Sequence, residues 1–585
     1  MIDKNQQIAA RFPHAAGLWR IRVAAGAVFI ALTANGFSEP WRFDDVTQTQ
    51  NCLLTHQYIN VNKLSDYTMS GGVAAADYDL DGDIDLYVIT GDSSPNALLN
   101  NDGSGKFSNR TTLAGVGLPG MASSGPAFGD IDGDGWPDLL IGGVSGSGYK
   151  VFRNNGNGSF TDWTEASGIV QETAQQNDYS SALGDPDRDG DLDLFVSHWG
   201  AGAITNHLWI NDGTGHFTKG DGSHGITGYV ATDFSFSPTF VDLNGDGWQD
   251  LTVAGDFQTS QIYMNQGDGT FSNSTTAVID DENGMGSAVA DLDNDGDMDW
   301  FVTSIFADGP IPFSWGPSGN RLYQNDGSGN FTNVTESSGV REGHWGWGAC
   351  AADFNNDGWL DLFHVNGMPL KNPTVDFNVD PSRLFINNGD GSFMEMSAAV
   401  GLVDQGQGRG VACFDADLDG DLDLFVANYD GETRLYRNNL DGRANYLQVK
   451  LIARGGNISA IGAKLTLRAG DLIQYREVTA GSNYESQNPL VQHFGLAANS
   501  TVDQLTITWP DGSAESIENL PANQLLVVNQ TAAPRRPGHI HPVVVLPAWA
   551  SRVMPRQDAF AGASQIKRFA LNPVRYHSKQ PRKNE

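Results

Sequence analysis

Cysteine and basic residues are scarce in this chain, and familiar enzyme motifs are missing. Three cysteines in 585 residues are too few for a disulfide scaffold. The 35 Lys and Arg residues face 70 Asp and Glu residues, a net charge of −35. This balance argues against nucleic-acid binding, which needs basic stripes on the protein. The chain also has neither a nucleophile elbow nor an HExxH sequence, so no common hydrolase motif is present.

The acidic residues are concentrated in a nine-residue pattern that occurs seven times and contains 30 of the 70. Each copy has Asp at positions one, five and nine, Asp or Asn at position three, and Gly at position six. Small residues precede each copy and strand-like runs follow it, so the flanking helices of an EF-hand are absent. The copies are DYDLDGDID (77–85), DIDGDGWPD (130–138), DPDRDGDLD (185–193), DLNGDGWQD (242–250), DLDNDGDMD (291–299), DFNNDGWLD (353–361) and DADLDGDLD (415–423).

Alternate carboxylates in a tight turn are typical of a calcium loop. Calcium takes roughly six to eight oxygen ligands, and such a turn points its oxygens at one centre. The glycine permits the sharp bend, and the seventh residue is expected to contribute its backbone carbonyl. One copy would also fit a solvated acidic turn, but seven copies predict up to seven calcium ions. The predicted ligands are Asp77, Asp79, Asp81, Asp83, Asp85, Asp130, Asp132, Asp134, Trp136, Asp138, Asp185, Asp187, Asp189, Asp191, Asp193, Asp242, Asn244, Asp246, Trp248, Asp250, Asp291, Asp293, Asp295, Asp297, Asp299, Asp353, Asn355, Asp357, Trp359, Asp361, Asp415, Asp417, Asp419, Asp421 and Asp423.

Position three distinguishes two of the loops from the other five. It is Asn244 in the fourth loop and Asn355 in the sixth, so each of these loops has three carboxylates where the others have four or five. Because ligand charge tunes calcium affinity, these two sites are expected to be the weakest and the first to empty during chelation. Their repeats are then expected to lose hydrogen-exchange protection first.

The seven copies start 49 to 62 residues apart, a period typical of stacked supersecondary units. Each repeat reads as a Gly/Ala-rich strand, the acidic loop, an apolar strand, a strand ending in Asn, and a Gly-rich hairpin before Phe. Four strands in each of seven repeats predict an all-β, seven-bladed β-propeller over residues 37–440. A parallel β-helix is the alternative, although its repeats would be shorter. The seventh repeat lacks a fourth strand, and Phe43–Thr47 is expected to supply it.

The two ends of the chain differ from the repeats. Residues 1–36 are typical of a secretory signal, because arginines precede the apolar run Val23–Ala34. That run is too short to cross a membrane of roughly 30 Å. Cleavage is expected near Gly36, with an uncleaved anchor as the alternative. We therefore expect a secreted, periplasmic or extracellular protein with no membrane span after signal removal. Residues 531–585 are Pro-rich and basic, which predicts a disordered tail.

Residues 443–530 contain alternating apolar and polar runs separated by turns, which predicts a small C-terminal β-sandwich-like domain. The acidic repeats resemble the FG-GAP/VCBS repeats of integrin-like propellers, and this region resembles the ASPIC/UnbV domain. Together they resemble bacterial relatives of the cartilage acidic protein family. The resemblance implies calcium binding, export and an adhesion or scaffold role, and it implies no reaction. The segments that carry the second resemblance are NYLQVKL (445–451), AIGAKLTL (460–467), AGSNYESQ (480–487), HFGL (493–496) and LTITWPDG (505–512).

Two long connections indicate where a partner would bind. They are Thr303–Asn320 and Asn366–Ser382, and both are expected on the face opposite the acidic loops. The first contains the candidate partner-binding residues Phe306, Phe313 and Trp315. We expect a monomeric binding protein for a protein or glycan ligand at the cell surface or in the periplasm. A calcium-dependent polysaccharide lyase or a carbohydrate-binding protein is the alternative, and the lyase rests on fold analogy alone.

The three cysteines are expected to remain free. Cys350 and Cys413 lie in equivalent strands of neighbouring repeats, three and two residues before their acidic loops. Because side chains alternate along a strand, this opposite phase predicts that the two point to different faces. Cys52 has no evident partner in the sequence.

Overall fold

The computed structural model describes residues 41–59, 67–171, 176–200, 207–220, 222–226, 234–308, 316, 318–370, 376–481 and 483–531. The expected signal peptide and nearly all of the expected basic tail lie outside these residues. Within these ranges, no helix is both long and apolar enough to span a membrane. Short helices lie in the connections: α2 (Thr111–Ala114), α3 (Thr335–Ser338), η1 (Gly222–His224) and η2 (Phe377–Val379).

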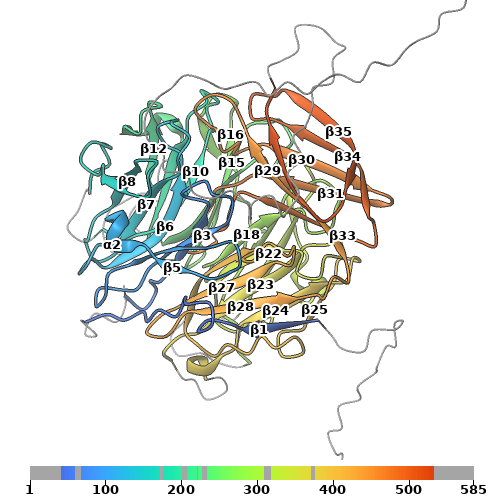
Figure 1. Cartoon of the computed structure of the whole chain (residues 1–585), viewed down its shortest axis with the longest axis horizontal. Helices are drawn as coiled ribbons and strands as arrows, with labels where there is room; N and C mark the ends of the chain where they lie inside the picture. Colours follow the sequence, from blue (N-terminus) through green and yellow to red (C-terminus); the bar gives the residue numbers. More distant parts are fainter. Residues whose placement is uncertain are drawn as a thin grey trace, which may run out of the picture. The chain divides into compact units, whose positions relative to one another are not determined.

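Seven sheets form a seven-bladed β-propeller, as the repeats predict (Figure 1). In each blade the acidic loop joins the first two strands, and the chain then runs outward through antiparallel neighbours. The blades are β2 (Val73–Ala76), β3 (Asp85–Val88), β4 (Ala97–Asn100) and β5 (Ser108–Asn109); β6 (Ser123–Gly129), β7 (Asp138–Gly143), β8 (Lys150–Asn154) and β9 (Phe160–Asp162); β10 (Asp178–Gly184), β11 (Asp193–His198), β12 (His207–Asn211) and β13 (Phe217–Lys219); β14 (Ser235–Val241), β15 (Asp250–Gly255), β16 (Gln261–Asn265) and β17 (Phe271–Asn273); β18 (Ser287–Ala290), β19 (Asp299–Val302), β20 (Arg321–Asn325) and β21 (Phe331–Asn333); β22 (Gly346–Ala352), β23 (Asp361–Asn366), β24 (Arg383–Asn387) and β25 (Phe393–Glu395); and β26 (Gly408–Phe414), β27 (Asp423–Asn428), β28 (Arg434–Asn439) and β1 (Arg42–Asp45).

The first described strand closes the ring. β1 pairs antiparallel with β28, and Phe43 lies opposite Asn438. Blade seven therefore takes its outer strand from the start of the chain, which confirms the prediction for Phe43–Thr47. This arrangement covers a sheet edge that would otherwise be open.

The asparagine at the end of each third strand ties neighbouring blades together. Its buried side-chain amide donates to the second-residue carbonyl of the preceding blade's acidic loop, at 2.7–2.9 Å in all seven blades. The bond from Asn101 to Ala416 joins blade one to blade seven and completes the circle. The seven residues are Asn101, Asn154, Asn211, Asn265, Asn325, Asn387 and Asn438.

The expectation that Cys350 and Cys413 remain free is wrong, because the structure joins them in a disulfide with Cα atoms 6.9 Å apart. The two residues lie on β22 and β26, the innermost strands of adjacent blades. Each blade is a sheet with two faces, and each face packs against a different neighbouring blade. Side chains that meet between two adjacent blades therefore point from opposite faces of their own sheets. Opposite phase therefore turns the two side chains toward each other. Cys52 is free and buried.

The C-terminal domain is a sandwich of two sheets with a buried apolar core that includes Leu447, Leu465 and Ile507. Its strands are β29 (Asn445–Ile452), β33 (Gln492–Ala497) and β36 (Leu525–Asn529) in one sheet, and β30 (Lys464–Ala469), β31 (Leu472–Glu477), β34 (Thr501–Thr508) and β35 (Ala514–Pro521) in the other.

This domain sits on the acidic-loop face of the propeller and contacts all seven loops. Close approach occurs at the glycines of the loops, and a Cβ added to Gly420 would overlap the ring of Tyr446. The contacts, in loop order, are Lys450 with Asp77, Gly456 with Gly133 and with Gly190, Lys464 with Asp242, Tyr475 with Gly296, Leu472 with Gly358, and Gln448 with Asp415.

A segment of the same domain enters the propeller axis. β32 (Ser486–Gln487) pairs in parallel with β2, the innermost strand of blade one. The Tyr484 hydroxyl donates to the Met69 carbonyl at 2.6 Å, and the Glu485 carboxylate accepts from the Gly71 amide at 2.6 Å. Small residues on the innermost strands leave room for it, since a Cβ at Gly72 would overlap the carbonyl of Glu485. Residues 484–487 of the motif AGSNYESQ therefore lie at the centre of the ring.

Replacing Asn387 with Ala tests the asparagine ring. The variant loses two bonds from a buried amide, to the carbonyls of Leu292 and Leu360, and leaves both carbonyls unpaired. We expect the free energy of unfolding to fall by about 2–4 kcal/mol. The matched control is Asn388→Ala at the next residue, whose amide makes an exposed bond to Ser392 and should change stability by less than about 0.5 kcal/mol. Equal effects of the two substitutions in denaturant titrations would show that the ring contributes little.

Candidate metal loops and the opposite face

The first aspartate of an acidic loop organises the turn around itself. In loop two, Asp130 accepts from the amides of Asp134 and Gly135 at 3.1 and 2.9 Å. Loops five, six and seven repeat these two bonds at their own fifth and sixth residues. Gly135 has φ +94°, a conformation that favours glycine. In loops two, five and seven the side chains of positions one and three then converge with that of position five or nine.

The ninth aspartate connects the loop to the third strand of its blade. In loop two, Asp138 accepts from the amides of Asn154 and Ile131 at 2.7 and 3.1 Å. It is fully buried, and this burial raises the pKa of Asp138 to about 8. Burial likewise raises the pKa of Asp299 to about 8 and that of Asp250 to about 7. In the absence of a cation, the site thus opposes the charged form of these carboxylates.

Five loops bring at least three carboxylates together. In each, oxygens from three aspartates lie within 4.8 Å of one another. Several aspartate clusters in this chain could therefore hold metal ions. The groups are Asp77, Asp79 and Asp85; Asp130, Asp132 and Asp138; Asp185, Asp187 and Asp189; Asp291, Asp293 and Asp295; and Asp415, Asp417 and Asp423.

Loop one shows most directly that the donors suit a hard cation. Four of its carboxylate oxygens are buried and have no hydrogen-bond partner among the described residues: Oδ1 of Asp77, Asp79 and Asp83, and Oδ2 of Asp85. Buried charged oxygens without partners are costly, and a divalent ion would satisfy them. The set contains only oxygen, which favours calcium or magnesium over zinc or copper.

Position seven has a role that the sequence left open. Its side chain covers a glycine of the hairpin between the third and fourth strands of the same blade. A Cβ added to Gly156 would overlap the ring of Trp136, and one at Gly389 would overlap Trp359. Asp297 lies against Gly327 in the same way. In the loops of Trp136, Trp359 and Asp297 the side chain faces the hairpin, so a contribution to the metal would come from the backbone carbonyl, which remains a prediction.

Loops four and six lack a cluster of three converging carboxylates among the described residues. In both, the third-position amide donates to the fifth-position carboxylate, from Asn244 to Asp246 and from Asn355 to Asp357, each at 2.9 Å. The amide nitrogen thus occupies an oxygen that a cation would otherwise bind. This geometry agrees with the expectation from charge that these loops are the weakest.

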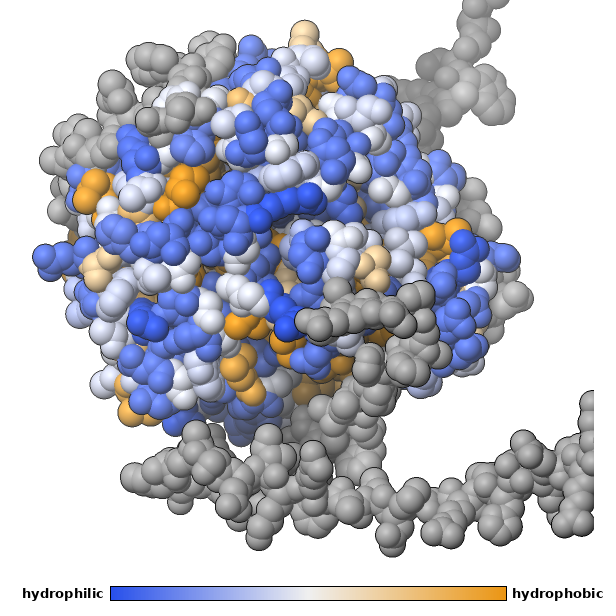
Figure 2. All heavy atoms as spheres, turned by 90° about the horizontal axis from the view of Figure 1, so that it is seen from above, coloured by the Kyte–Doolittle hydropathy of each residue, from blue (hydrophilic) through white to orange (hydrophobic). Residues whose placement is uncertain are grey.

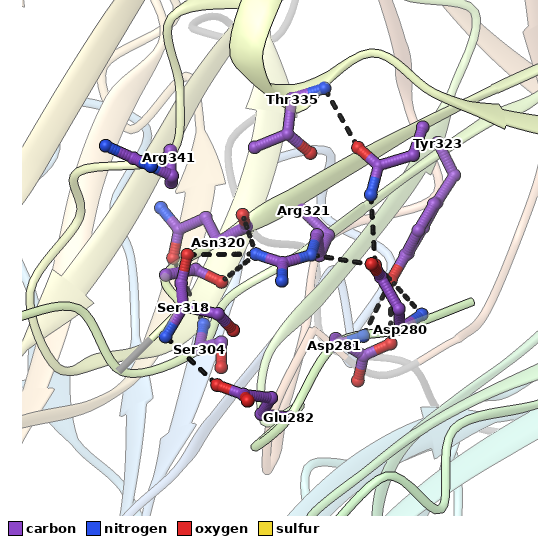
Figure 3. A network of polar contacts seen from close by, with 12 residues as sticks. Asp280, Asp281, Glu282, Ser304, Ser318, Asn320, Arg321, Tyr323, Thr335 and Arg341 are labelled. Atoms are coloured by element: carbon purple, nitrogen blue, oxygen red, sulfur yellow. Dashed lines mark hydrogen bonds and ion pairs between the residues drawn. The ribbon is translucent and has the colours of Figure 1, made fainter. Parts of the chain in front are cut away.

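The opposite face carries the long connection of blade five, and a polar network anchors its base (Figure 3). Arg321 donates to Asp280 at 2.8 Å and also binds the carbonyls of Ser318, Gly319 and Asn320. Tyr323 accepts from the amide of Asp280 at 3.0 Å. Guanidinium and carboxylate thereby fix the point where the connection re-enters the blade.

Of the candidate partner residues in this connection, only Phe306 belongs to the described part of the chain. It is 7% exposed and lies beneath Arg341, whose guanidinium carbon is 5.2 Å from the ring centre. Phe306 therefore supports the connection from inside. Phe313 and Trp315 lie outside the described residues, and their role in partner binding stays a prediction.

His344 joins the two long connections. Its ring stacks on Phe306 of the first at an interplanar angle of 3°, and its Nδ1 lies 2.7 Å from the buried carboxylate of Asp380 in the second. His344 has φ +62°, an uncommon conformation for this residue type. The ring is about one-third exposed. A histidine oriented by a buried carboxylate can act as a hydrogen-bonding group or a proton acceptor.

Hydrophobic side chains on the surface are dispersed. Figure 2 shows one face on which hydrophilic residues dominate and hydrophobic ones form small separate groups. The exposed large hydrophobic residues of the described chain come from distant elements, for example Leu113, Phe257 and Val403.

Comparisons with known proteins agree with this architecture. The model for the FG-GAP-like repeat matches residues 77–141, 130–196, 185–253, 242–302 and 313–364, and the model for ASPIC and UnbV matches residues 453–535. Cartilage acidic protein 1, which has this architecture, is similar to the chain. The Mus musculus protein is 26% identical over 505 residues, covering 78% of this chain and 73% of that protein. The Homo sapiens protein is 25% identical over 509 residues, covering 79% and 72%.

One solved structure concerns recognition of non-reducing terminal N-acetylglucosamine by an Agrocybe aegerita lectin. It is 18% identical, covers 61% of this chain and 88% of its own, and has a TM-score of 0.37.

Replacing Asn355 with Asp tests the control of affinity by position three. The variant raises the number of carboxylates in loop six from three to four and removes the amide that donates to Asp357. We expect calcium affinity in this loop to rise on the order of tenfold. Hydrogen exchange of blade six across a chelator titration measures it, since the variant should keep blade six protected to higher chelator concentrations. Asn388→Asp adds the same charge outside the loop and should leave the profile unchanged. If blade six of the unaltered protein is the last blade to lose protection, the number of carboxylates does not set the order in which the loops lose calcium.

Proposed function

Because the chain combines FG-GAP-like repeats with an ASPIC and UnbV domain, we propose that it is an exported calcium-binding propeller that holds a protein or glycan ligand. The ligand binds on the face that carries the long connections of blades five and six. The observation that supports this assignment most is the position of the C-terminal domain, which contacts all seven acidic loops and thereby occupies the other face.

Calcium acts here on the scaffold. The ion would be held by carboxylates such as Asp77, Asp79 and Asp85, whose buried oxygens otherwise repel one another. Binding fixes the loop between the first two strands of a blade, to which the C-terminal domain is attached. Export supports this role, because extracellular modules bind calcium at concentrations near 10⁻⁴–10⁻³ M.

Calcium removal tests the scaffold role. At about 2 mM calcium, each site with a Kd of about 10⁻⁴–10⁻³ M adds about 0.7–1.8 kcal/mol to the free energy of unfolding. The protein is first kept in about 2 mM calcium, which is close to the extracellular level. We expect a large fall in Tm when EGTA is added, and recovery of the Tm when calcium is restored. Magnesium at the same concentration serves as the control and should recover less, since it demands octahedral geometry and retains its waters. An unchanged Tm in EGTA would contradict calcium binding by the folded protein.

Ligand binding on the opposite face is supported by how the two long connections are held. Phe306, His344 and Asp380 join them, and Arg321 anchors the first to the preceding blade. Such bracing pre-organises a binding surface and lowers the entropic cost of association. Glycan arrays and matrix-protein arrays, probed with the full chain, would identify the ligand class.

Deleting Asp308–Pro317 tests the location of the binding face. The deletion removes most of the blade-five connection and retains Phe306 and Arg321, which lie on either side of it. We expect loss of capture of the ligand found on the arrays, with calcium-dependent Tm unchanged. A control deletion in the exposed hairpin Asn388–Gly391 should retain capture. Undiminished capture after the first deletion would refute the assigned face.

A polysaccharide lyase is the second candidate, and the dyad of His344 and Asp380 favours it. Nδ1 of His344 lies 2.7 Å from Asp380 and 3.0 Å from the guanidinium of Arg383; in the tautomer whose Nδ1 proton is donated to Asp380, Nε2 could accept a proton. Incubation with uronate polysaccharides, followed by absorbance of the unsaturated product, tests this. Product formation that disappears in His344→Ala would support the lyase, and absence of product would leave ligand binding as the function.

A further inference from the structure

Loop four (Asp242–Asp250) is contacted by two basic side chains although it has only three carboxylates. Lys464 on β30 places its ammonium on Oδ2 of Asp242. Arg188 donates to the carbonyl of Gly247, and its guanidinium carbon lies 4.5 Å from the ring centre of Trp248. Loop one also meets a lysine, but it has five carboxylates, and its Asp77 belongs to a cluster of three.

The carboxylate of Asp242 has no free acceptor position. Its Oδ1 accepts from the amides of Asn244 and Gly245 at 3.3 and 2.8 Å, and its Oδ2 accepts from the amide of Gly247 at 2.6 Å and from Lys464. A carboxylate offers about four lone-pair sites, so these four donors saturate it. The turn also differs from loops two, five, six and seven, where the amide of the fifth residue bonds to the first aspartate.

The other polar side chains of loop four also have hydrogen-bond partners within the protein. Asn244 Oδ1 accepts from the amide of Asp246 at 2.9 Å, and its Nδ2 donates to the carboxylate of Asp246 at 2.9 Å. Asp250 accepts from the amides of Asn265 and Leu243. Within the described part of the chain, no carboxylate oxygen of this loop is buried without a partner, in contrast to loop one. With its first aspartate saturated by four donors, the site fits a metal ion less well than loop one does.

The C-terminal domain holds Asp242 from two sides. Lys464 and Glu477 are direct partners across the β30–β31 ladder. Lys464 binds the side chain of Asp242, while the carboxylate of Glu477 accepts the backbone amide of Asp242 at 3.2 Å. Lys464 thus complements the charge of Asp242 while Glu477 binds its backbone, and the side chain of Asp242 is 1% exposed.

We propose that loop four is a docking site for the C-terminal domain, in which the ammonium of Lys464 supplies the positive charge that a metal ion would supply in the other loops. The ring then binds at most six ions. This inference rests on the proposed calcium binding by the remaining loops. It also changes the expectation for blade four, whose hydrogen-exchange protection should respond to chelation less than that of the other blades, whereas blade six should open first.

Anomalous diffraction from crystals of the full chain grown with terbium, a calcium substitute, tests the inference without any substitution. We expect peaks at loops one, two, three, five, six and seven, and none at loop four. A terbium peak at loop four with the occupancy of its neighbours would overturn the inference. Absence of peaks at every loop would instead refute calcium binding, so the two failures are distinguishable.

Substitution provides an independent test by native mass spectrometry. In the double variant Lys464→Met and Asn244→Asp, the ammonium is removed and a fourth carboxylate is supplied, so the number of bound calcium ions should rise by one. Lys450→Met is the matched control, because it removes the equivalent ammonium from loop one, whose cluster already fits an ion. Its ion count should equal that of the unaltered protein. An unchanged count in a folded double variant would contradict the stand-in role of Lys464.

Discussion

Repulsion between closely spaced carboxylates is the constraint on which the rest of this structure depends. Seven loops hold 30 acidic side chains, and burial strengthens their repulsion because it lowers the local dielectric. Each carboxylate must therefore meet a backbone amide, a basic side chain or a bound cation. The ninth aspartate uses amides, as Asp138 does with Asn154. The orphaned oxygens of loop one, such as Oδ1 of Asp79, are those left for a cation.

The same constraint explains how the two domains combine. The loops of the propeller are acidic, and the C-terminal domain places the ammonium groups of Lys450 and Lys464 on two of them. The propeller axis is filled by residues of that domain, with Tyr484 and Glu485 bonded to the first blade. The domain therefore covers one face and fills the centre, which leaves the other face for the ligand that we propose.

The connection between blades depends less on charge. Seven asparagine amides link each third strand to the acidic loop of the preceding blade. A change in one loop is thus transmitted to the next blade through a buried hydrogen bond. This coupling gives a physical reason why metal occupancy at single loops would affect the stability of the whole ring.

The sequence by itself determined the blade number, the acidic loops and the closing strand, because these follow from local patterns. The repeat of Asp, Gly and small residues sets each turn, and the unpaired segment Phe43–Thr47 matched a missing strand. The tertiary structure alone decided what depends on neighbours distant in the chain. Opposite phase at Cys350 and Cys413 produces a disulfide only because blades pack face to face. Likewise, Lys464 and Asp242 lie in different domains and more than 200 residues apart in the sequence. Their ion pair forms only when the two domains pack together, so residue spacing could not reveal it.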